Sequence, residues 1–237
     1  NHLAYVSTPL SPMEAIPVSP VGRTYRYPEE LRNQLVIDVI HDGAYLPPEY
    51  LVDGHGKPIP EEIVRRQFQI ERDWGANRVA DRIAGRLGLP HYYTVHTARC
   101  LMDFGRFPGI TQEGATHLRR FAINHPFSEL LNFNQKRRLL EEHYDRISRD
   151  MDMAVRDKGV KIAVHTYDRY NPSGTERPEV SLVTRALGYQ LDSEMPYGVF
   201  DPLYPDILAE VTVDRILRDR VSLNLEKAGI PVAHNYP

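Results

Sequence analysis

Two kinds of hydrophobic pattern alternate along this chain. Short runs of apolar, β-branched residues predict buried strands, and apolar residues that recur every three or four positions predict amphipathic helices. The expected strands are 35–40, 91–97, 161–166, 179–187 and 230–234, with a further extended segment at 99–106. Helices are expected within 60–87, from Ser128 to about residue 158, and from Pro205 to Gly229. Strands that alternate with helices predict an α/β fold with three layers, helices on either side of a sheet.

The proline-rich first 34 residues show little periodicity and predict an N-terminal arm or lid. Residues 35–237 are expected to form a single α/β domain, since a chain of 237 residues can bury a sizeable core. The chain stops directly after its last predicted strand, and we expect further residues to complete the C-terminal end of that domain.

Composition excludes several classes of protein. A net charge of −3 argues against a nucleic-acid-binding protein, which would usually carry a basic face. Cys100 is the single cysteine, which rules out an internal disulfide or a cysteine-based zinc site and favours a reducing, cytoplasmic location. No apolar stretch approaches the length of about 18 residues that predicts a membrane span.

Two of the predicted strands run directly into a histidine. The strand at 35–40 ends at His41, and the strand at 161–166 reaches His165. In open α/β sheets, chemistry collects at the carboxyl ends of strands, and imidazole is the commonest metal ligand. A catalytic zinc also needs a third ligand, for which Glu71 and Asp73 are the nearest carboxylates in the sequence. The alternative is that each histidine is a structural residue.

Arginines surround an acidic residue in the segment 99–106. Arg99 and Arg106 flank Asp103, and guanidinium groups bind carboxylates bidentately. One arginine is expected to hold Asp103 while the other binds an anionic small-molecule substrate; a structural ion pair is the alternative. The polar segment 166–177, which includes Asp168 and Arg177, predicts a substrate loop, with an ordinary surface loop as the alternative.

These residues together resemble a known family. The order of several short motifs is similar to that of the N-formylglutamate amidohydrolase family. These motifs are His41-Asp42-Gly43 with Pro47, Asp73-Trp74, Arg99/Asp103/Arg106, His165-Thr166 and the segment from Gly229 to Asn235 and Pro237. The resemblance covers residues 35–237. It implies a three-layer αβα sandwich with a mixed sheet, like that of zinc exopeptidases.

The same resemblance implies an activity and a set of site residues. The activity is zinc-dependent hydrolysis of a linear amide on an N-acylated, typically N-formylated, acidic amino acid. His41, Asp73 and His165 would hold one Zn²⁺, and Arg106 would bind a carboxylate of the substrate. Arg99, Arg177 and Asn235 are further candidates for binding the substrate.

The sequence also departs from the family pattern. Asp42 follows the first histidine where the family has a small residue, Gly105 stands where the family has an asparagine, and the family's late glutamate, its expected general base, is absent. The base is therefore expected from a further C-terminal segment, or from Asp42, Asp168 or Glu179. Two other functions stay open: a metal-free binding or regulatory protein on the same fold, and a carboxypeptidase-like peptidase.

Overall fold

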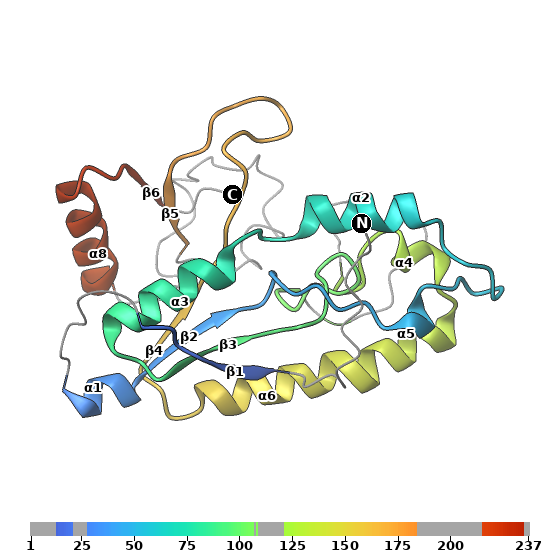
Figure 1. Cartoon of the computed structure of the whole chain (residues 1–237), viewed down its shortest axis with the longest axis horizontal. Coiled ribbons are helices and arrows are strands. Elements are labelled where there is room, and N and C mark those ends of the chain that lie inside the picture. The colour runs from blue at the N-terminus through green and yellow to red at the C-terminus, as the bar shows by residue number, and fades with distance from the viewer. Residues whose placement is uncertain (1–12, 21–27, 107, 109–120, 184–214, 235–237) are drawn as a thin grey trace, which may run out of the picture. The chain divides into compact units, whose positions relative to one another are not determined.

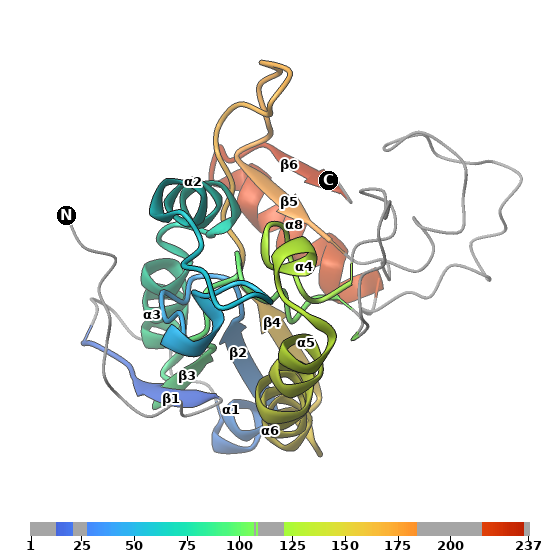
Figure 2. The ribbon, with the colours of Figure 1, turned by 90° about the vertical axis from the view of Figure 1, so that its right-hand side faces the viewer.

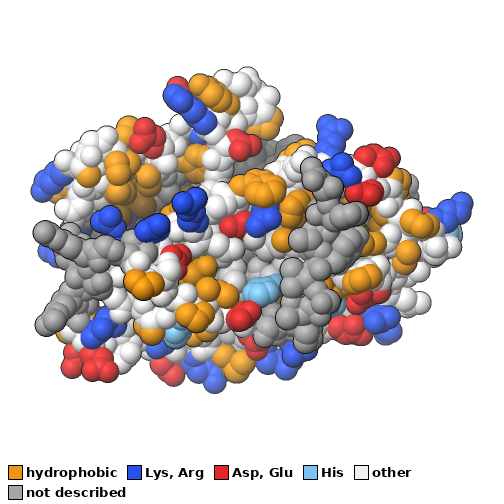
Figure 3. Space-filling model, viewed as in Figure 1, with side chains coloured by type: hydrophobic (Ala, Val, Ile, Leu, Met, Phe, Trp, Pro, Cys, Tyr) orange, Lys and Arg blue, Asp and Glu red, His pale blue; other side chains and the backbone are white. Residues whose placement is uncertain are grey.

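The computed structural model describes residues 13–20, 28–106, 108, 121–183 and 215–234 (Figure 1). The chain divides into two compact units, Asn1–Tyr167 and Asp168–Pro237. Within the described ranges, no helix combines the length and the apolar character that crossing a lipid bilayer requires. Acidic and basic side chains are interspersed over the face seen in Figure 3.

A mixed four-stranded sheet forms the centre of the first unit. Its strands are β1 (Glu14–Pro17), β2 (Leu35–Val39), β3 (His91–Thr94) and β4 (Val160–Ala163), in the order β1-β3-β2-β4. Strand β2 pairs in parallel with both β3 and β4, and β1 pairs antiparallel with β3. The predicted α/β fold with a mixed sheet is confirmed.

Helix α3 (Ala76–Leu87) packs against one face of this sheet. Ile37 and Val39 of β2 contact a row of alanines on the helix, Ala76, Ala80 and Ala84, all fully buried. Small side chains at every fourth position let the helix approach the strands closely. The helix ends at Gly88, whose φ of 70° is the left-handed conformation that glycine adopts without strain.

The helical region expected over 60–87 is two helices. Helix α2 (Glu61–Glu71) ends before a four-residue link, and α3 begins at Ala76 after Gly75, which has a φ of 81°. Glu61 and Glu62 lie in the first turn of α2, where carboxylates interact favourably with the helix dipole. The link between the two helices carries Asp73.

Opposite α3 lies a broken helical segment, whose last helix covers the other face of the sheet and whose earlier parts lie beyond the strand ends (Figure 1 and Figure 2). It consists of α4 (Phe127–Leu130), α5 (Phe133–Leu139), a π-helical turn (Leu140–Tyr144) and α6 (Asp145–Val155). Leu139 and Ile147 are buried in the core cluster that also contains Ile40 and Val95. The single helix expected from Ser128 is wrong at its beginning, because the side chain of Asn132 caps a new helix there.

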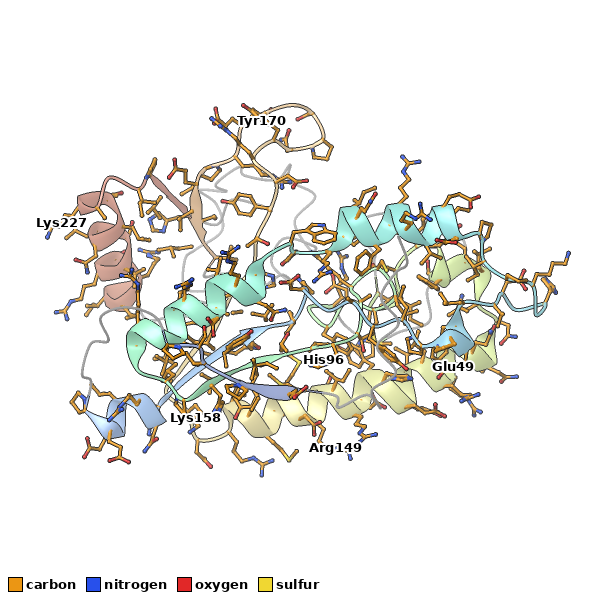
Figure 4. All side chains as sticks on the ribbon, in the orientation of Figure 1. Glu49, His96, Arg149, Lys158, Tyr170 and Lys227 are labelled. Atoms are coloured by element: carbon orange, nitrogen blue, oxygen red, sulfur yellow. The ribbon has the colours of Figure 1, made fainter. Side chains whose placement is uncertain are left out.

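Among the described residues of the first unit, the remaining short helices are α1 (Glu29–Asn33) and a 3₁₀ turn (Pro48–Tyr50). In the second unit, β5 (Val180–Leu182) and β6 (Val232–His234) pair in parallel, and α8 (Arg215–Lys227) precedes β6. The loop 168–178, which carries Tyr170 (Figure 4), is closed by hydrogen bonds from the Ser173 and Thr175 N–H groups to Asn171 Oδ1. Residues 184–187 and 205–214 of the expected elements lie outside the described residues.

Candidate metal centre

Strand pairing brings the two strand-end histidines together. Strands β2 and β4 are parallel neighbours, with Asp38 opposite Ala163, so that their carboxyl ends meet at one edge of the sheet. His41 and His165 follow these ends at similar distances along the chain. Their rings are 4.8 Å apart between centroids, and the two Nδ1 atoms are 3.1 Å apart.

Asp73 completes a cluster of three possible ligands. Its backbone N–H donates to the His41 carbonyl at 3.0 Å, which holds the link between α2 and α3 beside the end of β2. Asp73 Oδ2 lies 2.8 Å from His165 Nδ1 and 3.5 Å from His41 Nδ1. Glu71, the other carboxylate considered from the sequence, is not part of this cluster; its Oε2 is 3.9 Å from Arg99 Nε.

The donor atoms of this cluster fit a metal ion. A tetrahedral zinc with bonds of ~2.0–2.2 Å holds its ligand atoms about 3.4 Å apart. The three observed separations are 2.8, 3.1 and 3.5 Å. His41 and Asp73 are buried, whereas the side chain of His165 is 42% exposed. The cluster is thus accessible from the His165 side.

A buried carboxylate fixes the orientation of His41. His41 Nε2 donates to Asp103 Oδ1 at 2.7 Å, and the Gly105 N–H donates to the same oxygen at 2.8 Å. Because an ionised carboxylate can only accept, the proton of neutral His41 resides on Nε2. The lone pair on Nδ1 therefore faces Asp73 and His165, and a carboxylate in this position orients a metal-binding histidine in many metal sites.

The segment expected to be extended at 99–106 is instead a turn. The Leu101 N–H donates to the Ala98 carbonyl, and the Arg106 N–H donates to the Asp103 carbonyl. A strand would separate residues 99 and 103 by about 13 Å. The turn instead brings both arginines to Asp103 Oδ2, with Arg99 Nε at 3.1 Å and Arg106 Nε at 2.9 Å. The prediction of an extended segment was wrong because this buried charge cluster determines the local conformation.

The same contacts set the charges of the cluster. Burial alone would raise the pKa values of Asp73 and Asp103, but hydrogen bonds from the histidines and the charge of Arg99 outweigh it and hold both pKa values well below the usual range. Burial lowers the pKa of His41, yet its hydrogen bonds to Asp103 and Asp73 raise the pKa above its ordinary value overall. Two ionised carboxylates thus lie next to the imidazoles, which favours a cation.

The other candidate residues have different partners, belong to the second unit or lie outside the described residues. Asp42 Oδ1 accepts from Arg72 Nε at 2.7 Å, and its Oδ2 accepts from the Asn77 N–H in the first turn of α3 at 2.9 Å. Asp168, Arg177 and Glu179 belong to the second unit. Asn235 lies outside the described residues.

Sequence reasoning missed Asn124 and assigned no contact to Thr166, and both residues support the cluster. Buried Asn124 donates from Nδ2 to the Arg99 carbonyl at 2.6 Å. Thr166 Oγ1 donates to the Trp74 carbonyl at 3.0 Å, which ties the segment after His165 to the segment after Asp73. Both contacts join residues far apart in the sequence, and no local pattern indicates them.

Comparisons with known proteins identify the fold. No protein-family model and no curated protein sequence matches the chain. The structure is similar to that of an N-formylglutamate amidohydrolase from Ralstonia eutropha JMP134, with a TM-score of 0.60 and 15% sequence identity over 95% of this chain and 76% of that chain. It is also similar to a gene product from Agrobacterium tumefaciens, with a TM-score of 0.52 and 18% identity over 86% of this chain and 69% of that chain. The fold expected from the resemblance is therefore confirmed.

Proposed function

We propose that this chain, which shares the fold of an N-formylglutamate amidohydrolase, is a metal-dependent hydrolase of linear amide bonds. The observation that carries the proposal is the convergence of His41, Asp73 and His165, whose donor atoms are separated by 2.8–3.5 Å. The proposed substrate is a small N-acylated acidic amino acid, and the proposed metal is zinc.

The chain's own residues have distinct parts in this reaction. His41, Asp73 and His165 hold the metal, which when bound polarises the amide carbonyl and lowers the pKa of a water molecule. Asp103 keeps the Nδ1 lone pair of His41 directed into the site. The exposed side of the cluster, at His165, admits the substrate.

Arg106 is the proposed partner of a substrate carboxylate. Its Nε is bound to Asp103 Oδ2, which anchors the guanidinium group beside the cluster. The terminal nitrogens of a guanidinium form the fork that binds carboxylates bidentately. Arg106→Lys keeps the charge but removes the fork, so KM should rise with a smaller change in kcat.

Asp42 is better suited to anchoring α3 than to proton transfer. Both of its oxygens are engaged, one with Arg72 and one with the Asn77 N–H. A proton acceptor must reach the water or the leaving amine. Asp168 and Glu179 are the remaining candidates from the sequence within the described residues.

The test is an assay of zinc-loaded protein against N-formyl-L-glutamate, other N-acyl amino acids and a C-terminally unblocked N-acyl dipeptide. Hydrolysis of the N-acyl amino acids, abolished by a chelator and restored by zinc, is expected. Hydrolysis of the dipeptide alone would identify a peptidase instead. A zinc-loaded, folded protein that cleaves none of them would contradict the hydrolase proposal.

A further inference from the structure

Four side chains around the candidate metal centre form a closed ring of contacts. Asp73 Oδ2 lies 3.5 Å from His41 Nδ1, and Asp73 Oδ1 accepts a hydrogen bond from Arg99 Nη1 at 2.9 Å. Arg99 Nε then donates to Asp103 Oδ2 at 3.1 Å, and Asp103 Oδ1 accepts from His41 Nε2 at 2.7 Å. One guanidinium thus connects a proposed metal ligand to the carboxylate that orients another.

We propose that Arg99 is a positioning residue that sets the separation of His41 and Asp73, and that it does not bind the substrate. The inference rests on the proposed metal site. Two of the nitrogens of Arg99 are bound to carboxylates, and its side chain is only 22% exposed. Asn124 donates to the backbone carbonyl of Arg99, so that the residue is held at its backbone as well as at its guanidinium group.

An arginine is needed at this position for geometric reasons. The guanidinium is planar and rigid, and its Nε and Nη1 donors point in different directions, so that one side chain can bind two carboxylates at a fixed distance. A lysine ammonium is a compact charge on a flexible stem and does not hold two carboxylates in a defined relative position. Arg99 also places a positive charge between Asp73 and Asp103, two buried anions that would otherwise repel each other.

Loss of this bridge should loosen the metal site without removing a ligand. Without Arg99 Nη1, Asp73 Oδ1 has lost its anchor, and the carboxylate can rotate away from the geometry in which Oδ2 faces both histidines. Supporting contacts of this kind typically contribute ~10–100-fold to metal affinity. A purely structural ion pair would instead change stability alone.

The experiment compares Arg99→Lys with Arg72→Lys by cobalt titration. Arg72 is the matched control, because it is equally exposed at 22% and forms a 2.7 Å ion pair with buried Asp42 outside the ring. Calorimetry gives the Co²⁺ affinity, the visible spectrum of the bound Co²⁺ reports its coordination geometry, and thermal unfolding gives the stability of each variant.

We expect Arg99→Lys to bind Co²⁺ about 10-fold more weakly, with an altered visible spectrum. Arg72→Lys should lower the unfolding temperature while its Co²⁺ affinity stays within about twofold of the wild-type value. Equal affinities and spectra for wild type and Arg99→Lys, or equal losses in both variants, would overturn the inference. If the wild-type protein binds no Co²⁺, the metal site of the proposed function itself fails.

A second variant, Arg99→Gln, keeps the test decisive if Arg99→Lys does not fold, because it also removes the bridge between the two carboxylates and should weaken Co²⁺ binding by a similar factor. Asp103→Asn breaks the ring at its other carboxylate and should weaken Co²⁺ binding by a similar factor. Where both single variants fold, the double variant Arg99→Lys/Asp103→Asn should bind Co²⁺ no more weakly than Asp103→Asn alone, because both substitutions break the same ring. Additive losses would show that Arg99 and Asp103 act separately.

Discussion

At the scale of single residues, close packing explains why a glycine, Gly43, follows His41-Asp42. A Cβ at this position would lie 2.5 Å from the carbonyl oxygens of Val95, His96 and Thr97. These are backbone atoms just after the end of β3, where the Tyr45 N–H also donates to the His96 carbonyl. The glycine therefore lets the loop after His41 lie directly against the neighbouring strand end.

Gly43→Ala should consequently destabilise the protein strongly. Backbone cannot move aside as a flexible side chain can, and overpacking of this kind costs about 3 kcal/mol. Urea unfolding of wild type and variant measures the difference. A free energy of unfolding close to that of the wild type would show that the loop is not packed as described.

The thiol of Cys100 should be inert in the native protein. It is 1% exposed, and burial raises its pKa to about 12. Since the thiolate is the reactive form, a disulfide reagent at pH 8 should label Cys100 only as fast as the protein opens. The labelling rate with and without urea checks this. Rapid stoichiometric labelling without urea would contradict the burial of this side chain.

At the scale of elements, Asn132 determines where α5 begins. Its Oδ1 accepts from the Gln135 N–H at 2.9 Å, and Gln135 Oε1 accepts from the Asn132 N–H at 3.0 Å, a reciprocal capping box. Asn132→Ala should lower the free energy of unfolding by about 1 kcal/mol. Asn134→Ala, two residues later within the same helix, is the matched control. Similar effects of the two substitutions in chemical unfolding would argue against the cap.

Elements that depend on a local pattern could be predicted from the sequence. Strand β2 and the region of β4 are apolar runs, and their ends correctly located His41 and His165. The expected burial holds for β2, whereas Val160–Ala163 of β4 are half-buried or exposed because β4 has a strand neighbour on one side only among the described residues. The turn at 99–106 and the new helix at α5 depend on partners elsewhere: the buried Asp103 cluster in one case and the side chain of Asn132 in the other. Hydrophobic periodicity predicts neither the turn nor the new helix.

The candidate site, too, was predictable from the sequence only in part. Two strand-end histidines and a nearby carboxylate were visible in the sequence, and parallel pairing of β2 with β4 brings them together. The choice of Asp73 over Glu71 for the cluster depends on the hydrogen bond between the Asp73 N–H and the His41 carbonyl. The contact of Asp103 with His41 joins residues 62 positions apart, and no spacing rule reveals it.

At the scale of the whole molecule, the fold and the site support the proposal in different ways. Fold similarity at 15% identity establishes the architecture, and fold alone does not determine chemistry. The proposed activity therefore depends on the three possible ligands, which come from separate segments of the chain. A metal bound by His41, Asp73 and His165 would join the end of β2, the link between α2 and α3, and the segment after β4.

The most direct test is to measure the metal content of the protein by mass spectrometry. The protein is purified without added metal and then equilibrated with zinc. We predict about one tightly bound zinc per chain, with His165 contributing one of its ~2.0–2.1 Å bonds. His165→Ala should lose the ion. His96→Ala should retain it, because His96, labelled in Figure 4, pairs with Glu14 at 3.1 Å and is not part of the cluster. A wild-type protein that binds no zinc, or a His165→Ala variant that binds it as tightly as the wild type, would contradict the account.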